Sequence, residues 1–498
     1  MAIQPKRVLF ITDVEPGELN VFLAAAQAVR DADYTVEIHL ATTPGFDDDV
    51  PAGAAYHQIN GLPLKQAVED TFNRKQNGPT FPLSFIQPPG FRNTRKAIKD
   101  AAAVHMPYTG RQMVDLFASI VNIIRSVNPT LVVVNSSMAA GLTACYHLDV
   151  KFICLSPKSI KEFAASEQPR GARLWKYPAL FSGFSYPVPW HKVLLNAYYV
   201  NFTAKAFKKD TQRKDVQSYL TAHTVLKTPM DLIRRRPDNV KILVASLPQL
   251  DFPLKIPAHV VACGPIIRHP ASVWVSEPDL AEWLTEGRTI YVNMGSLVKM
   301  TEDQAVELAK ALKIVINELD KDVKKGRIQV LWKLKKYGAY SVFLPGCRIE
   351  QVLCQAFQQD RIRVKEWIQA DPLAVFRTGS VVCSIHHGGA NSYNEAVVLT
   401  QNHSAGIPQV IIPAWTDCYD YAQRVEFLGI GRWGTRNMKN GWSARALANK
   451  ILQVLVGQMS VGVKKRCNVL KQICEFSGSG ADFAALMILR ECEPRIVE

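Results

Sequence analysis

The sequence lacks the patterns that mark disulfide-bonded, zinc-binding or membrane-spanning proteins. Its ten cysteines include no CxxC pair, so neither a zinc site nor a disulfide framework is indicated, and we expect buried thiols in a reduced protein. No apolar run is long enough to span a bilayer, and the start, MAIQPKRVLFITDV, carries an apolar run too short for a signal peptide. These absences predict a cytoplasmic protein.

Two motifs that hold cofactors or metals are also absent. No GxGxxG turn is followed by an acidic ribose-binding residue, which disfavours an NAD-dependent dehydrogenase. No Asp-x-Asp metal motif lies at a predicted strand end, and the run Asp47-Asp48-Asp49 is typical of a solvated loop. We therefore expect no metal ion and no resident cofactor.

Acidic residues are fewer than basic ones, which gives a formal net charge of +15 at pH 7. The lysines and arginines are scattered, and no aromatic-interleaved basic motif of a known nucleic-acid module is present, so we expect no nucleic-acid partner. A basic balance also suits anionic nucleotide sugars, or at most a peripheral contact with an anionic membrane surface.

The 498 residues are too many for one core and predict two domains. Short apolar runs without alternation read as buried parallel strands, and helical patterns follow several of them. The first α/β series has predicted strands at 7–12, 35–40, 131–134 and 152–155 and helices at 21–30 and 113–126. The second has strands at 289–294, 330–332, 381–383 and 410–412 and a helix at 302–319. Two doubly wound domains are predicted, residues 1–265 and 280–474, with a linker at 266–279.

Two segments rich in proline and aromatic residues, 78–90 and 177–202, interrupt the first series. Irregular apolar loops at strand ends commonly form small-molecule pockets, although such loops also pack together without a ligand.

The most informative stretch runs from Cys383 to Glu395, CSIHHGGANSYNE. A strand, a glycine turn and a helix in this order present free backbone N–H groups to a phosphate. Gly388 and Gly389 allow the turn and a close approach, while Asn391 and Ser392 fall in the first helical turn, where the helix dipole favours an anion. A glycine-rich cap on a buried strand is the plainer interpretation, but the full His-Gly-Gly-x-Asn-Ser-x-x-Glu string favours a nucleotide site.

This string and its surroundings resemble the donor-binding signature of the family 1 glycosyltransferases, which are UDP-sugar-dependent enzymes of the GT-B fold. The resemblance covers nearly the whole chain and is carried by His387-Gly388-Gly389-Ala390-Asn391-Ser392, Glu395, Ala405-Gly406-Ile407-Pro408-Gln409-Val410, Pro413, Trp415, Asp417 and Arg424-Val425-Glu426. The stretch 415–420 is most similar to the fungal branch. The resemblance implies two Rossmann-like domains facing across a cleft, with a closing helix in 475–498 packed back against the first domain.

For the donor, the resemblance implies a role for each matching residue. Gly295, Ser296, His387, Gly389, Asn391 and Ser392 would surround the diphosphate; Trp367 would stack on uracil and the Ile368 backbone would read its edge; Glu395 would bind the ribose and Asp417 the sugar hydroxyls. This set would neutralise the diphosphate without a metal. Plant members usually have Gln after the Asp417 position, whereas this chain has Cys418, so the donor sugar does not carry over.

The catalytic pair of the family is replaced. The resemblance puts a His base after the first strand and an orienting Asp after a later one, and these positions hold Glu18 and Asn135. Glu18 has the right chemistry for a base if burial raises its pKa, and a neutral Asn135 avoids repelling it. Alternatively, another group such as His105 serves, an acidic acceptor needs little help, or the protein is inactive.

The predicted function is therefore an inverting, UDP-hexose-dependent O-glycosyltransferase that acts on a lipophilic small molecule, such as a fungal secondary metabolite or a sterol. A nucleotide-sugar-binding partner of another transferase is the alternative. Residues 399–404 separate two segments that relatives join directly, and they predict a surface bulge, although an error at a splice boundary would produce the same sequence.

Overall fold

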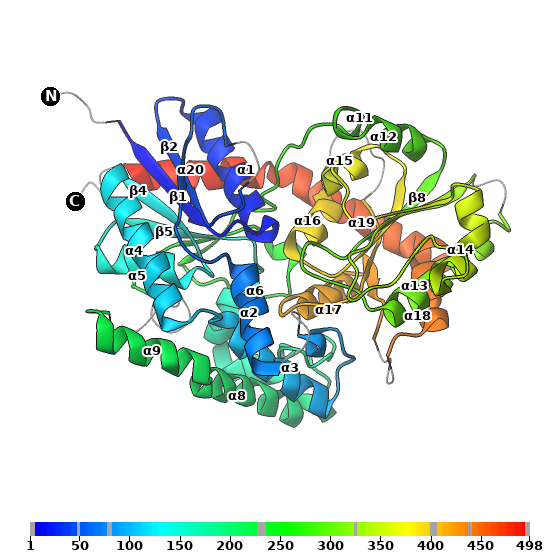
Figure 1. The fold of residues 1–498 in the computed structure, drawn as a ribbon, viewed down its shortest axis with the longest axis horizontal. Coiled ribbons are helices and arrows are strands. Elements are labelled where there is room, and N and C mark those ends of the chain that lie inside the picture. Colours follow the sequence, from blue (N-terminus) through cyan, green and yellow to red (C-terminus); the bar gives the residue numbers. More distant parts are fainter. Residues whose placement is uncertain are drawn as a thin grey trace.

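The computed structural model describes residues 5–46, 50–76, 82–226, 236–322, 326–398, 406–436, 438 and 441–493. Within them the chain forms two parallel β-sheets, each flanked by helices, which lie side by side in Figure 1. The predicted bulge at 399–404 and the run Asp47-Asp48-Asp49 lie outside the described residues.

The first sheet has the strand order β3-β2-β1-β4-β5-β6-β7, and all of its pairs are parallel. Its strands are β1 (Arg7–Thr12), β2 (Glu37–Thr42), β3 (Ala55–Gln58), β4 (Leu131–Asn135), β5 (Phe152–Ser156), β6 (Ile242–Val244) and β7 (Val260–Ala262). Its helices are α1 (Pro16–Ala32), α2 (Leu64–Gln76), α3 (Phe91–His105), α4 (Gly110–Val127), α5 (Ala139–His147), α6 (Ile160–Ala164), α7 (Ala172–Trp175), α8 (Val193–Lys209) and α9 (Thr211–His223).

The second sheet has the order β10-β9-β8-β11-β12-β13 and is also parallel throughout. Its strands are β8 (Arg288–Asn293), β9 (Ile328–Lys333), β10 (Ile362–Lys365), β11 (Val381–His386), β12 (Gln409–Ile411) and β13 (Gly431–Trp433). Its helices are α11 (Val273–Ser276), α12 (Pro278–Thr285), α13 (Glu302–Leu319), α14 (Arg348–Gln358), α15 (Pro372–Arg377), α16 (Ala390–Val398), α17 (Cys418–Leu428) and α18 (Ala444–Leu455).

The apolar runs recognised in the sequence are the central strands of these sheets. Every residue of β4 and β5 is buried, as expected for parallel strands covered by helices on both faces. Phe10 in β1 lies between Leu40 of β2 and Val133 of β4, and all three side chains are buried. The predicted α/β architecture with two doubly wound sheets is confirmed.

Two local predictions are wrong. The helix expected to begin at Val21 begins at Pro16, because proline is well suited to the first helical position, where no N–H bond is lost. Glu18 therefore lies in the first turn of α1 and not in a preceding loop. The segment 177–202, expected to be irregular, is helical from Val193 onward, where α8 begins.

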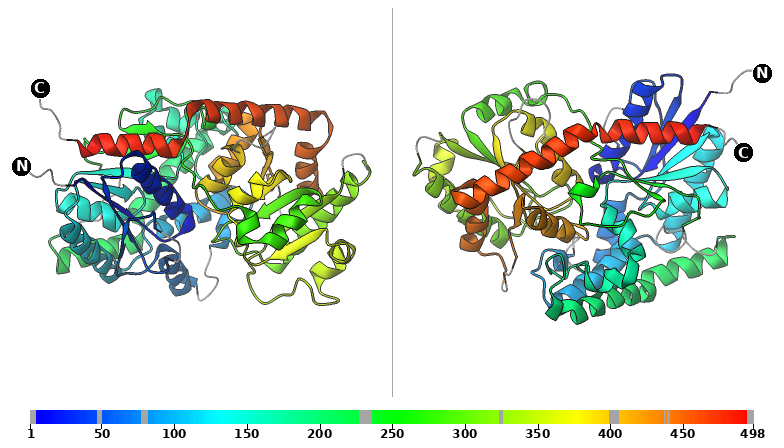
Figure 2. Two further views of the ribbon diagram at one scale, coloured as in Figure 1. Left: turned by 90° about the horizontal axis from the view of Figure 1, so that it is seen from above. Right: turned by 180° about the vertical axis from the view of Figure 1, so that it is seen from behind.

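The last two helices cross from one half of the molecule to the other. In Figure 2, α19 (Gly457–Ser477) lies along the second half and α20 (Gly480–Cys492) continues over the first. The backbone approaches closely at Gly480, where a Cβ would lie 2.5 Å from the Pro265 carbonyl oxygen. At the far end of α20, Glu491 pairs with Lys241 at 2.6 Å and with Lys151 at 3.5 Å. The exact domain boundaries stay a prediction.

No single helix among the described residues is long and apolar enough to cross a membrane. One bent pair of helical segments, Ala444–Leu455 with Gly457–Cys492, reaches the length and composition of a membrane span only when the two are taken together.

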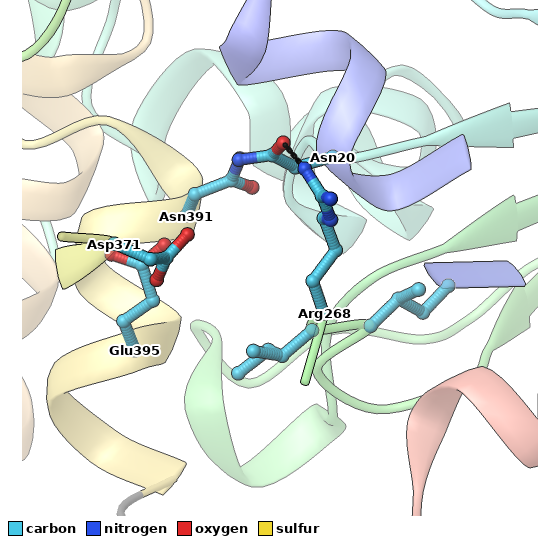
Figure 3. A pocket seen from close by; sticks show the side chains of 7 residues that line it. Asn20, Arg268, Asp371, Asn391 and Glu395 are labelled. Carbon is cyan, nitrogen blue, oxygen red and sulfur yellow. Dashed lines mark hydrogen bonds between the residues drawn. The ribbon is translucent and has the colours of Figure 1, made fainter. Parts of the chain in front are cut away.

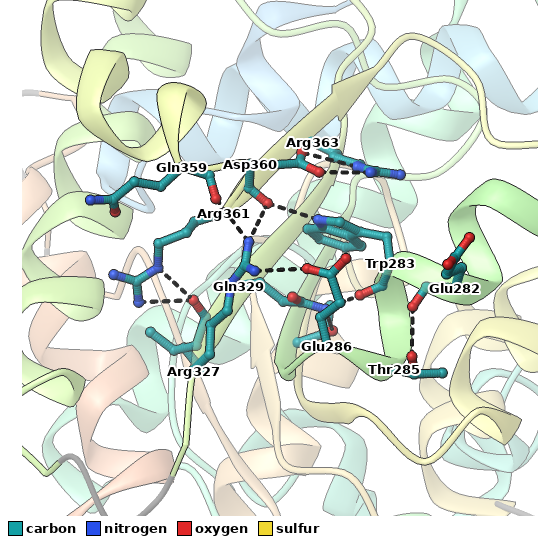
Figure 4. A network of polar contacts seen from close by, with 12 residues as sticks. Glu282, Trp283, Thr285, Glu286, Arg327, Gln329, Gln359, Asp360, Arg361 and Arg363 are labelled. Atoms are coloured by element: carbon teal, nitrogen blue, oxygen red, sulfur yellow. Dashed lines mark hydrogen bonds and ion pairs between the residues drawn. The ribbon is translucent and has the colours of Figure 1, made fainter.

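A polar network fixes the edge of the second sheet (Figure 4). Arg327 pairs with Glu286 at 2.7 Å and donates to the Asp360 carbonyl at 2.8 Å, while the Trp283 indole donates to the same carbonyl at 2.7 Å. These bonds tie α12 to β9 and to the turn before β10. The network connects helices and strands to one another and contains none of the predicted site residues.

Buried polar contacts join the two halves. Arg424 of α17 lies 3.2 Å from Asp251, which follows β6, and both side chains are fully buried. Lys161 of α6 pairs with Asp420 of α17 at 2.6 Å, and the Tyr419 hydroxyl donates to the Phe85 carbonyl at 2.9 Å. The start of α17 is therefore held against the first half by several bonds.

Candidate active site

Four of the predicted site residues lie at the two points where the strand order reverses, whereas Trp367 and Ile368 follow the edge strand β10 and Asp417 follows β12. In the first sheet this point lies between β1 and β4, and in the second between β8 and β11. Ligands of open parallel sheets bind outside the carboxyl ends of the strands at such a point. Glu18 follows β1 and Asn135 ends β4, while Gly295 follows β8 and His387 follows β11. The topology therefore places Glu18 and Asn135, and likewise Gly295 and His387, where ligand binding is expected.

Glu18 and Asn135 contact each other directly. The Asn135 amide nitrogen donates to Glu18 Oε2 at 2.9 Å and to Thr12 Oγ1 at 3.0 Å. The Asn135 amide oxygen accepts from the Ser137 backbone N–H at 2.7 Å, which fixes the orientation of the amide. Burial raises the pKa of Glu18, although Lys158 and the bond from Asn135 oppose this. A carboxyl with a raised pKa is a stronger proton acceptor than an exposed one.

Lys158, after β5, lies among carboxylates. Its ammonium group pairs with Glu162 of α6 at 2.8 Å. Burial lowers the pKa of Lys158, but the negative charges of Glu162, Glu18 and Asp417 outweigh this and raise it above the usual value. Burial and the charge of Glu162 raise the pKa of Asp417 to about 7, with Lys158 opposing. Asp417 thus belongs to the second half of the molecule but responds to charges of the first.

His387 lies in a narrow space between two glycines. A Cβ on Gly295 would lie 2.6 Å from its Cε1, and one on Gly389 would lie 2.4 Å from its Nε2. Burial lowers the pKa of His387 to about 3, with further contributions from His386 and Lys333, so the ring is neutral. Its buried Nδ1 has no hydrogen-bond partner among the described residues. A neutral imidazole with an unused nitrogen can bond a phosphate oxygen.

The first turn of α16 faces the first half of the molecule. The Gly389 carbonyl accepts the first helical bond, from the Tyr393 N–H, so Ala390, Asn391 and Ser392 form the first turn, whose N–H groups have no partner within the helix. The Asn391 side chain points across the interface and donates to the carbonyls of Pro16 at 3.4 Å and Gly17 at 3.3 Å. The predicted donor helix therefore touches the turn that carries Glu18.

A polar pocket lies beside this contact. It is lined by Asn20, Ile266, Ile267, Arg268, Asp371, Asn391 and Glu395. In Figure 3 Asn20 and Asn391 face one another across it, and Arg268 donates to Asn20 at 3.4 Å. Burial raises the pKa of Glu395 to about 8, and the charge of Asp371 adds to the effect while Lys333 opposes it. Glu395 Oε2 is buried without a hydrogen-bond partner among the described residues, which suits a hydroxyl donor such as a ribose.

Trp367 is partly exposed, at 44% of the residue. The Lys333 ammonium lies 3.6 Å from the ring centroid and the Lys335 ammonium 4.7 Å from it. Burial lowers the pKa of Lys333 to about 8, with the nearby Lys335 adding to the effect. A base can stack on this indole only where neither ammonium group covers the ring.

The remaining predicted residues are Gly295 and Ser296 after β8, Ile368 after β10, and the alternative base His105 at the end of α3. Gly295 has a φ of +82°, which favours glycine, and its N–H bonds the Asn293 side chain at 3.0 Å. Ser296 follows it, and its carbonyl accepts from Lys335 at 2.9 Å. Ile368 is buried beside Trp367. His105, the alternative base, is exposed at the end of α3, with its ring 5.3 Å from that of Phe207.

Sequence reasoning missed Lys158, Asp371 and Arg268. Asp371 precedes a proline and reads as a helix cap, which it is, since its carboxylate accepts from the Leu373 N–H at 2.8 Å. Its position next to Glu395 follows from the packing of α15 against α16 and has no signature in the sequence. Lys158 and Arg268 are single basic residues in loops, and no local pattern distinguishes them from the other lysines and arginines.

Known proteins resemble this chain in sequence and in fold. No protein-family model matches the chain. A glycosyltransferase, sdnJ, of the fungus Sordaria araneosa is 32% identical over 453 residues, covering 86% of this chain and 83% of that protein. UDP-glycosyltransferase 75B2 of Arabidopsis thaliana is 26% identical over 296 residues, covering 53% and 60%. The crystal structure of Medicago truncatula UGT71G1 complexed with UDP-glucose superimposes with a TM-score of 0.63 at 13% identity, covering 98% of this chain and 99% of that one.

The structural similarity shows the GT-B fold, and the fungal relative shows the family. The alternative of a non-catalytic partner is not favoured, because the relatives are named as transferases. The protein is an enzyme, and the chain belongs to the family 1 UDP-glycosyltransferases.

Proposed function

We propose that this enzyme transfers a hexose from a UDP-sugar, with inversion at the anomeric carbon, to a hydroxyl group of a lipophilic small molecule such as a secondary metabolite or a sterol. The observation that carries the proposal is the contact of Asn391 with the Gly17 carbonyl, 3.3 Å long, which brings the predicted donor helix next to the turn bearing Glu18. Donor and base would then lie on opposite sides of one interface.

The donor is held by groups of the second sheet. His387 and the N–H groups of Asn391 and Ser392 bind the diphosphate, and Glu395 accepts from the ribose. Neutral donors and the positive end of α16 replace a cation, so the proposed reaction needs no metal. UDP-glucose is the first donor to test, because the Medicago truncatula structure contains it.

Glu18 is the proposed general base. Asn135 bonds Oε2, so Oε1 accepts the proton of the acceptor hydroxyl. As this O–H bond breaks, the oxygen forms a bond to the anomeric carbon from the face opposite the diphosphate. The bond between that carbon and the diphosphate oxygen breaks in the same step, and its electron pair leaves with UDP.

Phe85 and Phe181, from the two segments rich in proline and aromatic residues, pack against the second half of the molecule. The ring of Phe85 lies 5.1 Å from that of Phe181 and 5.3 Å from that of Trp415, and Phe181 lies 5.1 Å from Tyr419. These rings come from both halves of the molecule. Phe85, Phe181 and Tyr419 are buried, so these rings pack the interface between the halves, and the lipophilic acceptor rests on the resemblance to the family.

The proposal is tested by incubating the enzyme with UDP-glucose and an extract of the producing organism, followed by a mass search for hexosylated products. We expect a product heavier by one hexose that depends on both the enzyme and the donor. An enzyme that releases UDP from no tested UDP-sugar and yields no such product would contradict the proposal.

A further inference from the structure

The stretch from Gln168 to Lys209 contains no Asp or Glu, as is also true of residues 116–148 and 427–474. The stretch 168–209 contains Arg170, Arg173, Lys176, Lys192, Lys205, Lys208 and Lys209. All of it is described by the structure, and it comprises α7, α8 and the connection between them. A charge distribution this one-sided attracts an anionic partner.

Large apolar side chains are exposed on the same stretch. Trp190 and Leu194 are each 87% exposed, and Trp175, Leu174 and Tyr198 are also exposed. Trp190 precedes α8 and Leu194 lies in its first turn. Two neighbouring large apolar side chains with almost no protein contact are unusual on a surface without a partner. We call the exposed part of residues 168–209 the aromatic-basic surface.

Helical spacing puts the apolar and basic groups on one face of α8. The exposed positions Leu194, Tyr198, Asn201, Lys205 and Lys208 follow one another at intervals of three or four residues and form one stripe. The N-terminal part of this stripe is apolar and the C-terminal part is basic. The opposite face packs on α3, to which α8 is adjacent along the lower edge of Figure 1.

The neighbouring helix α3 extends the aromatic-basic surface. Phe91 is exposed and stacks on Tyr198 with ring centroids 5.8 Å apart. The Arg95 guanidinium lies 5.4 Å from the Phe91 ring centroid and 5.1 Å from that of Phe202. Arg92, Lys96 and Lys99 are exposed on the same helix, and its one acidic residue, Asp100, accepts a bond from Ser84 at 2.6 Å.

We propose that the aromatic-basic surface docks the enzyme onto an anionic lipid membrane. Tryptophan, tyrosine and leucine side chains partition into the interface between lipid headgroups and acyl chains, and lysines next to them keep their charge at the headgroups. Each lysine or arginine near an anionic bilayer adds to binding. Leu194 and the Trp190 side chain beside it fit acyl chains, whereas leucine offers a nucleic acid no stacking face.

The position of the surface links it to the proposed function. Residues 177–186 lie between α7 and α8, and Phe181 of this segment reaches the aromatic rings at the interface between the two halves. If the proposed lipophilic acceptor is correct, the docked enzyme would take that acceptor from the membrane. Membrane binding itself does not depend on the acceptor and is measured without turnover.

The test is co-sedimentation of the full chain with two kinds of vesicle, one of phosphatidylcholine alone and one containing about one third phosphatidylserine. We expect binding to the anionic vesicles that weakens with added salt, and much weaker binding to the neutral ones. The double variant Trp190→Ser with Leu194→Gln should reduce binding at least about tenfold. Replacing Lys205, Lys208 and Lys209 by Gln should reduce it about a hundredfold at low salt.

The matched control is the double variant Trp274→Ser with Val275→Gln on α11. This pair is also exposed, at 56% and 75%, but belongs to the second half of the molecule. It should bind vesicles like the wild type, and all variants should retain the wild-type circular dichroism spectrum and UDP affinity. Absence of anionic-vesicle binding in the wild type, or equal losses in both double variants, would overturn the proposal. Tighter binding to single-stranded RNA, lost in the same lysine variant, would also overturn it.

Discussion

The Asn135 amide nitrogen lies 2.9 Å from Glu18 Oε2. This hydrogen bond joins the end of β4 to the first turn of α1. In the family this pair is an orienting carboxylate and a base, and here both positions are changed together. An amide can orient a carboxylate by donating to it, whereas a second carboxylate would repel it. An amide at position 135 is therefore compatible with a carboxylate base at position 18.

Asn135→Asp should move the acid limb of the kcat/KM profile to higher pH. A negative charge beside Glu18 disfavours its ionised form, so the pKa of Glu18 rises further and a larger share of the enzyme carries a protonated base at neutral pH. The measurement is kcat/KM against pH for both proteins. Asn135→Ser is the control, since it is neutral and small. An acid limb at the same pH in Asn135→Asp would show that Glu18 does not control the rate.

Trp367→Ala should weaken UDP binding by about 1–3 kcal/mol, because the variant loses the indole face on which the base stacks. Isothermal titration calorimetry with UDP measures the change. Trp274→Ala, an exposed tryptophan on α11, is the control and should bind UDP like the wild type. Unchanged affinity in a folded Trp367→Ala protein would remove this residue from the donor site.

Turnover should survive removal of divalent cations. The proposed diphosphate ligands are His387 and backbone N–H groups at the start of α16, which would take the place of a cation. The measurement is initial rate after dialysis against EDTA, with and without added magnesium or manganese. A rate that disappears in EDTA and returns with either ion would refute metal-free transfer.

Arg424→Leu should destabilise the protein by about 3–5 kcal/mol, because it leaves the buried Asp251 carboxylate without its ion-pair partner. Asp251 accepts backbone bonds from Lys161 and Phe252, so its charge cannot move to solvent without breaking them. Chemical denaturation measures the change. Arg348→Leu, which removes an exposed ion pair with Asp303, should leave the unfolding midpoint nearly unchanged. Equal effects of the two variants would contradict this account of the interface.

The central strands could be predicted from the sequence because buried parallel strands are short and continuously apolar. β1 and the helix Glu302–Leu319 match their predicted bounds. The helix α8 was missed because its sequence, VLLNAYYVNFTAKAFKK, mixes aromatic and basic residues on an exposed face and follows a proline-rich loop. The short edge strands β3 and β13 carry few apolar residues and gave no strand signal.

The site was predictable where a motif carries it and not elsewhere. His387, Asn391 and Glu395 belong to one continuous string, so their roles could be proposed from local spacing alone. Lys158 comes near Glu18 and Asp417 through the order of the strands in one sheet and the packing of the second half against it. The bulge at 399–404 stays a prediction, and its deletion should leave UDP binding and the fold intact.

The most direct test of the account is the turnover of Glu18→Gln with UDP-glucose and an identified acceptor, compared with its affinity for UDP. Gln keeps the size and the hydrogen bond to Asn135 but cannot take a proton at neutral pH. We predict a kcat about 10²–10⁴-fold lower, with UDP affinity unchanged within error. The control Glu282→Gln, on the exposed face of α12, should turn over like the wild type. Near-native turnover by Glu18→Gln would contradict the central claim and make His105 the next residue to replace.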